Sequence, residues 1–251
     1  MTIRIAMWSG PRAISTAMMR AWENRSDTHV IDEPLYAHYL KATGAGHPGA
    51  DEVIATCDTS WESVSRELVE ISSNEIIYQK HMTHHLLGMI DRTWIDHLIN
   101  CFLLRSPARM AVSLDRVTPD PTIADTGLSE QLELFQRECD RRGTPPPVVV
   151  SADVLGDPRG MLTALCCAIG VPFDEAMLSW PAGPRDSDGA WAPHWYRTVE
   201  ASTGFGPPRL EETLVPDRLL GIIDQMQELY DQMAVHSLSP VRTEAQDVAD
   251  L

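Results

Sequence analysis

The sequence of 251 residues carries too little positive charge for a protein that binds nucleic acid or an anionic membrane. Lysine and arginine together number 20, against 36 aspartates and glutamates, and the formal net charge is −16. A surface with this balance repels polyanions. We therefore expect no nucleic acid and no membrane among its partners.

Long hydrophobic runs and paired cysteines are also missing. No stretch of 18 apolar residues exists, and the first residues enter a predicted strand without a signal-peptide pattern, so the sequence predicts a cytoplasmic protein. The cysteines form no C-x-x-C pair and have no metal-ligand spacing, so we expect reduced thiols and no metal site. They are Cys57, Cys101, Cys139, Cys166 and Cys167.

Predicted strands alternate with predicted helices along the chain. Strands are expected at residues 3–8, 28–31, 75–79, 99–104 and 147–151. Helices are expected at residues 15–25, 34–42, 60–72, 84–90, 107–114, 127–141, 158–169 and 217–235. This alternation predicts one α/β domain over residues 1–251, in three layers, with a mainly parallel central sheet flanked by helices. Ligands bind such sheets at the carboxyl ends of the strands.

Three segments interrupt this alternation. Residues 43–51 are rich in glycine and alanine and are expected to form a loop. Residues 180–208 are rich in proline and glycine, and an irregular stretch of that length is typical of a lid, a binding loop or disorder. We expect a lid-like loop there, and an acidic C-terminal tail from about residue 238.

Residues 5–20 have the pattern of a phosphate-binding loop. A short apolar strand leads into Gly10-Pro11-Arg12-Ala13-Ile14, and Ser15-Thr16 opens a helix. Gly10 allows a tight turn, the first N–H groups of the helix point at an anion, and the two hydroxyls add donors. The second glycine and the lysine of the P-loop pattern G-x-x-x-x-G-K-[ST] are absent, and Arg12 is the cation of this loop.

A second anion motif follows a later strand. An apolar strand ends at Arg105, Pro107 fits the first turn of a helix, and Ser113 lies eight residues after Arg105. A nucleotide hydrolase is expected to end this strand with an acidic Mg²⁺ ligand, whereas a guanidinium is suited to a second phosphate. The two motifs together indicate a nucleotide with two separated phosphate groups.

Both motifs resemble those of the sulfotransferase family. Residues 11–16 are similar to its Pro-[Lys/Arg]-x-Gly-Thr-Thr loop, which holds the 5′-phosphosulfate of 3′-phosphoadenosine 5′-phosphosulfate (PAPS), although Ile14 replaces the loop glycine. Arg105-Ser106-Pro107 with Val112-Ser113 is similar to its second motif, whose Arg and Ser bind the 3′-phosphate. The resemblance spans residues 3 to about 205. It implies a P-loop-like fold, PAPS as co-substrate without a metal, and transfer of a sulfo group to a hydroxyl of a small-molecule acceptor.

Two residues are candidates for the base that deprotonates the acceptor, alongside Arg12 as a catalytic cation. Glu33 lies between Asp32 and Pro34 at a strand end, although a carboxylate there also complements a helix dipole. His81 resembles the base of the family's Lys-Thr-His-Leu-Pro segment, with Gln79 in place of the lysine. A neutral imidazole suits proton transfer near pH 7, and the sequence favours His81 over Glu33.

A third stretch is faintly similar to the family's late loop over the 3′-phosphate. Arg185 would contact the phosphate, Gly189 would make the turn, and Trp191 would stack on the adenine or pack the lid. Trp195 and Tyr196 add aromatic surface for an acceptor pocket. The alternative function is a phosphotransferase (kinase) or a nucleotide-binding regulatory protein with a degenerate P-loop, and a homodimer is one assembly that the sequence allows.

Overall fold

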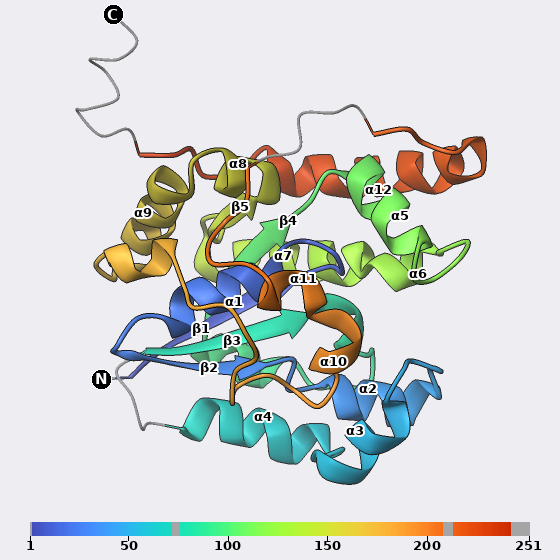
Figure 1. The fold of residues 1–251 in the computed structure, drawn as a ribbon, viewed down its shortest axis with the longest axis horizontal. Helices are drawn as coiled ribbons and strands as arrows, with labels where there is room; N and C mark the ends of the chain where they lie inside the picture. The colour runs from blue at the N-terminus through green and yellow to red at the C-terminus, as the bar shows by residue number, and fades with distance from the viewer. Residues whose placement is uncertain (1, 72–75, 208–212, 242–251) are drawn as a thin grey trace, which may run out of the picture.

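The fold is built on one parallel sheet, seen in a computed structural model that describes residues 2–71, 76–207 and 213–241. The strand order is β2-β3-β1-β4-β5 and every pair is parallel (Figure 1). The strands are β1 (Ile3–Ser9), β2 (Thr28–Asp32), β3 (Ile76–Met82), β4 (Ile99–Leu104) and β5 (Val148–Val150). All five strands expected from the sequence are therefore confirmed, except that residue 75 lies outside the described residues.

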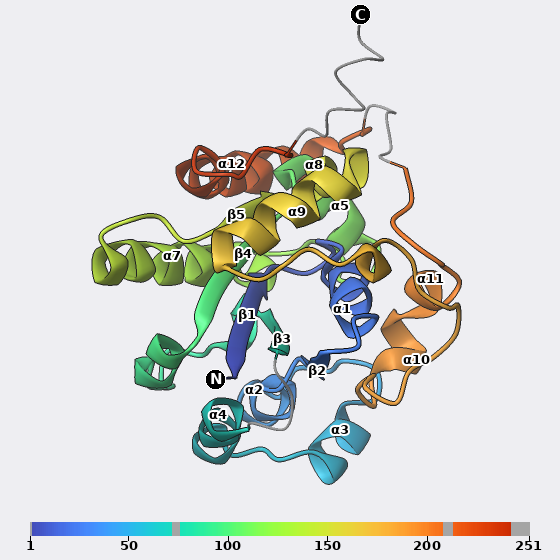
Figure 2. The same ribbon diagram turned by 90° about the vertical axis from the view of Figure 1, so that its left-hand side faces the viewer.

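Helices cover both faces of the sheet, so the three-layer α/β prediction is confirmed (Figure 2). One face packs on α1 (Ser15–Glu23), α8 (Ser151–Gly156) and α9 (Pro158–Ile169). The other packs on α4 (Trp61–Glu70), α5 (Pro107–Asp115), α7 (Leu128–Arg142) and α12 (Leu220–Ala234). Burial on both faces explains why the strands read as nearly continuous apolar runs rather than alternating ones.

Short elements form a third hydrophobic cluster beside the sheet. Its helices are α2 (Tyr36–Thr43), α3 (Ala50–Thr56), α10 (Ala192–Trp195) and α11 (Arg197–Glu200). The remaining elements are α6 (Ile123–Thr126) and the 3₁₀ turns η1 (Thr83–His85), η2 (Thr93–His97), η3 (Glu175–Leu178) and η4 (Asp217–Leu219). Figure 1 shows α10 and α11 beside the arrowhead of β3, although more than 100 residues separate them in the chain.

The helix expected at residues 84–90 is wrong. Only the 3₁₀ turn η1 forms there, and the carbonyl oxygens that a helix would pair with amides accept hydrogen bonds from Arg92 instead. Its guanidinium donates to Leu86 O at 3.0 Å and to Leu87 O at 2.9 Å. A side chain further along the sequence thus replaces the helical ladder, which local periodicity does not reveal.

The segment 180–208 is more regular than its composition suggests. It contains α10 and α11, and the side chains of Trp191 and Tyr196 are buried in the third cluster. Residue 208 and most of the acidic tail, from residue 242, lie outside the described residues. The segment 43–51, expected to be a loop, already contains the first residues of α3. That residues 180–208 act as a lid stays a prediction.

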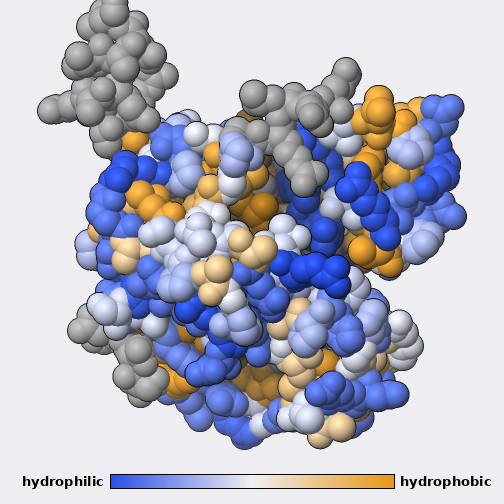
Figure 3. Space-filling model, viewed as in Figure 1, coloured by the Kyte–Doolittle hydropathy of each residue, from blue (hydrophilic) through white to orange (hydrophobic). Residues whose placement is uncertain are grey.

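The surface carries apolar side chains at a few places. Figure 3 shows hydrophobic residues gathered at the upper right, where Figure 1 draws α12 and α5. Val117, Leu220 and Val235, all near these helices, are 43%, 49% and 76% exposed. The homodimer stays a prediction.

None of the described helices combines the length and apolar character needed to cross a bilayer. All five cysteines are free, with Cys101 and Cys166 buried.

Candidate functional site

The sheet topology places a crevice at the carboxyl ends of β1 and β4. The chain leaves β1 toward β2 on one side, and leaves β4 toward β5 on the other. In an open parallel sheet, the loops that diverge at such a point leave room for a ligand. The loop after β1 and Arg105 after β4 are the two segments that meet there.

The loop between β1 and α1 has an unusual backbone. Arg12 and Ile14 both have positive φ angles, of 64° and 60°. Only glycine adopts this region at little cost, so Ile14 takes the conformation of the glycine that the family motif has at this place. As the residue before α1, Ile14 offers no side-chain hydrogen bond to the helix. The helix begins at Ser15 without a side-chain cap, as an anion site requires.

Gly10 serves close packing rather than the turn expected from the sequence. Gly10 does not have a positive φ angle. The residues of this loop that adopt the left-handed backbone conformation are Arg12 and Ile14. A Cβ atom on Gly10 would lie 2.5 Å from the carbonyl oxygen of Thr126. The loop therefore needs glycine where it passes α6.

The two cationic motifs meet in the structure. Arg12 donates from Nε to Ser113 Oγ at 3.0 Å, and Arg105 donates to the carbonyl oxygen of Arg12. Partial desolvation of the guanidinium by the surrounding loop and, to a smaller extent, the charge of Arg116 lower the pKa of Arg12. Arg12 is exposed, whereas Arg105 and Ser113 are half-buried. We call this group, together with the start of α1, the arginine cradle.

The backbone of the cradle is fixed from behind. Ser151, at the start of α8, donates to the carbonyl oxygens of Ala13 at 3.0 Å and Leu104 at 2.6 Å. Ala13 and Ser15 are buried, while Pro11 and Thr16 are half-buried. The Ser151 hydroxyl thereby links the backbone of the β1 loop to the end of β4.

Glu33 lies at the end of β2, two strands or about 10 Å from β1. Its Oε1 atom accepts a hydrogen bond from Lys80 Nζ at 2.5 Å, and its backbone φ is 39°. Burial is the largest influence on the pKa of Glu33 and raises it, against the opposing effect of the Lys80 charge.

His81 is not placed to act as the base, which corrects the choice favoured by the sequence. It lies inside β3 rather than after it, and is 1% exposed. Its ring stacks on Trp8 at 4.2 Å and lies 5.8 Å from Trp94, and its Nε2 contacts Gln79 Oε1 at 3.1 Å. Burial lowers the pKa of His81 to about 3. The imidazole belongs to the hydrophobic layer below the sheet.

Arg185 also lies away from its expected position on the 3′-phosphate. Its guanidinium donates to Pro181 O at 3.0 Å and lies 3.9 Å from Glu23, at the last turn of α1, whereas the cradle is at the first turn. Trp191 is 5% exposed, so its ring packs inside the segment instead of offering a face to adenine. Gly189 is needed there, because a Cβ would lie 2.2 Å from the Trp191 ring.

A cluster of aromatic and imidazole rings lies between α2 and η1. Tyr36 stacks on His85 at 4.8 Å, and its hydroxyl contacts His47 Nδ1 at 2.8 Å. His84 and His85 lie 4.3 Å apart, and the Nδ1 atom of each is buried without a hydrogen-bond partner. Burial lowers the pKa of His84 to about 4 and that of His85 well below its usual value, so both rings are neutral near pH 7.

Sequence reasoning did not foresee how the residues around Glu33 contact one another. The contacts of Lys80 join β3 to the end of β2 and to α11's neighbour Tyr196, and no local pattern reports them. Asp32 also accepts a hydrogen bond from Gly189 N at 3.3 Å. Among the described ranges, no group of three or more His, Cys, Asp or Glu side chains is arranged to hold a metal ion.

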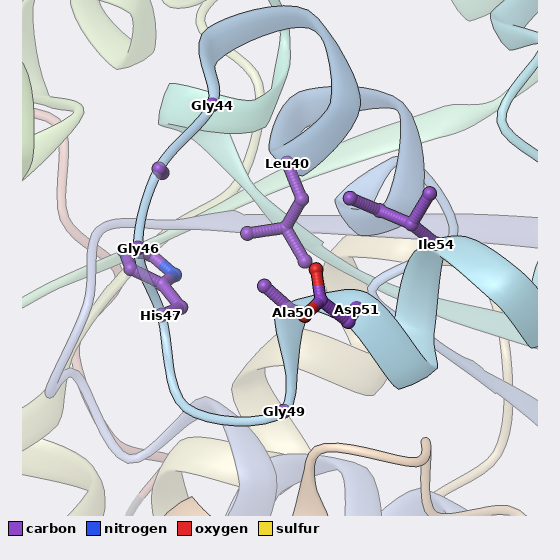
Figure 4. Close-up of a pocket in the computed structure, with 9 residues that line it drawn as sticks. Leu40, Gly44, Gly46, His47, Gly49, Ala50, Asp51 and Ile54 are labelled. Carbon is purple, nitrogen blue, oxygen red and sulfur yellow. The ribbon is translucent and has the colours of Figure 1, made fainter.

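A cavity of about 370 Å³ opens between α2 and α3. Figure 4 shows Leu40, Ala50, Asp51 and Ile54 turned toward the space enclosed by the loop from Gly44 to Gly49. His47 also lines it and contacts the ring cluster through Tyr36. The lining contains no residue of the arginine cradle.

Comparisons with known proteins agree with this geometry. Residues 3–233 match the family described as Sulfotransferase domain. Branched-chain-amino-acid aminotransferase-like protein 1 of Arabidopsis thaliana is 35% identical over 233 residues, which cover 92% of this chain but 42% of that protein. The chain thus spans about two fifths of that relative's length.

Two solved structures share the fold. The sulfotransferase domain of the Synechococcus PCC 7002 olefin synthase has a TM-score of 0.51 and 17% identity, covering 92% of this chain and 95% of that one. The sulfotransferase from Alicyclobacillus acidocaldarius has a TM-score of 0.52 and 10% identity, covering 94% and 95%. Together with the match over residues 3–233, the cradle and the sheet topology show that this chain belongs to the sulfotransferase family.

Proposed function

We propose that this protein is a PAPS-dependent sulfotransferase that moves a sulfo group to a hydroxyl of a small-molecule acceptor. The observation that carries the proposal is the meeting of Arg12, Arg105 and Ser113 at the start of an uncapped helix. Two guanidinium groups and free helix N–H groups match a nucleotide with two separated phosphates. Membership of a transferase family supports the same reading.

The cradle would hold the donor and stabilise the charge that develops during transfer. Arg105 and Ser113 fit the 3′-phosphate on the β4 side of the crevice. Arg12 and the first N–H groups of α1 fit the phosphosulfate at the end of β1. In the transition state, negative charge grows on the oxygen that bridges sulfur and phosphorus, and fixed donors at that place lower the barrier. In a protein with a net charge of −16, this local arrangement is what opposes repulsion of the donor.

Glu33 is the side chain that we propose as the base. It would accept the proton of the acceptor hydroxyl while the new O–S bond forms, and the S–O bond to the 5′-phosphate breaks to release adenosine 3′,5′-bisphosphate. Its side chain is 12% exposed, so the carboxylate is reachable. A raised pKa makes a carboxylate a stronger base, provided that it is ionised at the working pH.

Ligand binding tests the donor site. Adenosine 3′,5′-bisphosphate should raise the melting temperature, and ATP with Mg²⁺ should raise it much less at the same concentration. Transfer of ³⁵S from labelled PAPS to a panel of phenols, alcohols and sugars then identifies the acceptor, and turnover should persist in excess EDTA. Stabilisation by ATP with Mg²⁺ alone, or loss of turnover with EDTA and rescue by Mg²⁺, would support the phosphotransferase alternative.

Exchange of the base tests the chemistry. Glu33→Gln should lower kcat by about 10²–10⁴-fold and leave the affinity for adenosine 3′,5′-bisphosphate unchanged, because it removes a proton acceptor and no donor contact. His81→Gln is the matched comparison, and we expect kcat within about threefold of the parent. If both variants keep the parental kcat, Glu33 is not the base.

A further inference from the structure

Lys80 is a buried lysine whose ammonium is fully occupied. Its Nζ atom lies 2.8 Å from Asp32 Oδ1, 2.5 Å from Glu33 Oε1 and 2.6 Å from Tyr196 Oη. An ammonium has three N–H donors, so each one has a partner. Lys80 therefore has no donor left for a sulfo group.

Tyr196 closes the network from the other side. Its hydroxyl donates to Asp32 Oδ2 at 2.7 Å and accepts from Trp191 Nε1 at 3.1 Å. Gly189 N also donates to Asp32 Oδ2, at 3.3 Å. Residues 189–196 are thus joined to the end of β2 by the contacts of Tyr196 and Gly189 with Asp32, and to β3 by the contact of Tyr196 with Lys80. The strand ends and this distant segment form one hydrogen-bonded unit.

Exposure separates the members of this network. The side chains of Lys80 and Asp32 are each 1% exposed, and Tyr196 is 4% exposed, whereas the Glu33 side chain is 12% exposed. Two carboxylates share a single ammonium, so the network carries more acid than base. Among these side chains, that of Glu33 is the most exposed to solvent.

We propose that Lys80 and Tyr196 are positioning residues, which hold the Glu33 carboxylate at the end of β2 and couple residues 189–196 to the site of proton transfer. The inference deepens the proposed function and rests on it. It follows from geometry, because Lys80 binds both the Glu33 carboxylate and the Tyr196 hydroxyl, while Asp32 binds Lys80, Tyr196 and Gly189 N.

The charges around Glu33 give the network a predicted electrostatic signature. Burial raises the pKa of Glu33, the Lys80 charge lowers it, the Asp32 charge raises it, and the nearby hydroxyl of Tyr196 lowers it. Tyr36 on α2 faces the same region, and the Glu33 charge helps to raise its pKa. His85 on η1 is neutral there, since burial and nearby Lys80 lower its pKa. Removing Tyr196 should therefore raise the pKa of Glu33, and removing the Asp32 charge should lower it.

Two conservative variants measure that signature. Tyr196→Phe removes the hydroxyl that binds Lys80 and helps to lower the pKa of Glu33, so the acid limb of the kcat–pH profile should move to higher pH by about half a unit or more. Asp32→Asn removes a like charge and should move the limb to lower pH. Both should bind adenosine 3′,5′-bisphosphate as the parent does, since neither touches the cradle. A purely structural role would lower the melting temperature without moving the limb.

Tyr78→Phe is the matched control. Tyr78 lies on the same strand two residues before Lys80, is fully buried, and its hydroxyl has no hydrogen-bond partner among the residues that the structure describes. Its loss should change neither kcat nor the acid limb. Limbs for Tyr196→Phe and Asp32→Asn that coincide with the parent, or that move in the same direction, overturn the proposal.

A titration without turnover separates this inference from the proposed function. In protein labelled with ¹³C at the glutamate carboxyls, Glu33 is assigned as the resonance missing from Glu33→Gln. Its midpoint should rise in Tyr196→Phe and fall in Asp32→Asn. Opposite shifts with no sulfo transfer to any acceptor would uphold the network and reject the proposed function. If the titration midpoint of Glu33 is unchanged in both variants and the enzyme transfers sulfo groups, the proposed function stands and the network is rejected.

Discussion

At the scale of single residues, Arg105 distinguishes the two ends of the proposed donor. Arg105→Ala should weaken the binding of adenosine 3′,5′-bisphosphate by about 2–4 kcal/mol, because it removes a charge-assisted contact to the 3′-phosphate. Adenosine 5′-phosphosulfate lacks that phosphate, so its affinity should hardly change. Isothermal titration with both ligands measures the difference.

The control for Arg105 removes an equal charge elsewhere. Arg66 is exposed on α4, which covers the sheet face opposite α1, so Arg66→Ala should leave both affinities unchanged. Equal losses for the two ligands in Arg105→Ala would show that the arginine supports the loop backbone, through its hydrogen bond to the Arg12 carbonyl, and not the 3′-phosphate.

At the scale of elements, the contact between the β1 loop and α6 depends on Gly10. In Gly10→Ala the new methyl would lie 2.5 Å from Thr126 O, which belongs to the backbone and cannot swing away. The loop must shift, and we expect a loss of about 1–3 kcal/mol in the free energy of unfolding together with weaker donor binding. Denaturant titration and ligand binding measure the two effects. Gly88→Ala, with open space around its Cβ, should change neither, and the same result for Gly10→Ala would contradict this account.

The sequence predicted those elements whose signal is local. The five strands and the helices after β1 and β4 follow from apolar runs and from helix starts such as Pro107, so both anion motifs fell at the correct strand ends. The short helices α3, α6, α8, α10 and α11 were missed, because none is longer than seven residues and so short a helix shows little periodicity. Lys80 and Tyr196 are 116 residues apart, and no local pattern reports such a contact.

The same limit explains why the sequence favoured His81. His81 was expected just after a strand ending at residue 79, but β3 continues through Met82, and strand alternation puts His81 on the face opposite Lys80. The three further strand residues therefore place the imidazole in the core. Intrinsic pKa favoured histidine, and burial reversed that advantage.

At the scale of the whole molecule, buried neutral histidines should make stability depend on acid. The pKa of His81 falls from the usual 6.5 to about 3 in the folded state, so below pH 6.5 the unfolded chain binds a proton that the folded chain does not. Stability is therefore lost as the pH falls from about 6.5 toward 3, at about 1.4 kcal/mol per pH unit for this one group. His84 and His85 act in the same direction.

Melting temperatures measured between pH 7 and pH 4 test this dependence. His81→Gln should be less stable than the parent at pH 7, because the Trp8 stack is lost, yet its melting temperature should fall less steeply with acid. His29 is exposed on β2, and His29→Gln should keep the parental slope. If the slope for His81→Gln equals that of the parent, His81 takes up its proton at the same pH in the folded and unfolded chain. Its ring would then have to lie in water, which its position between Trp8 and Trp94 does not allow.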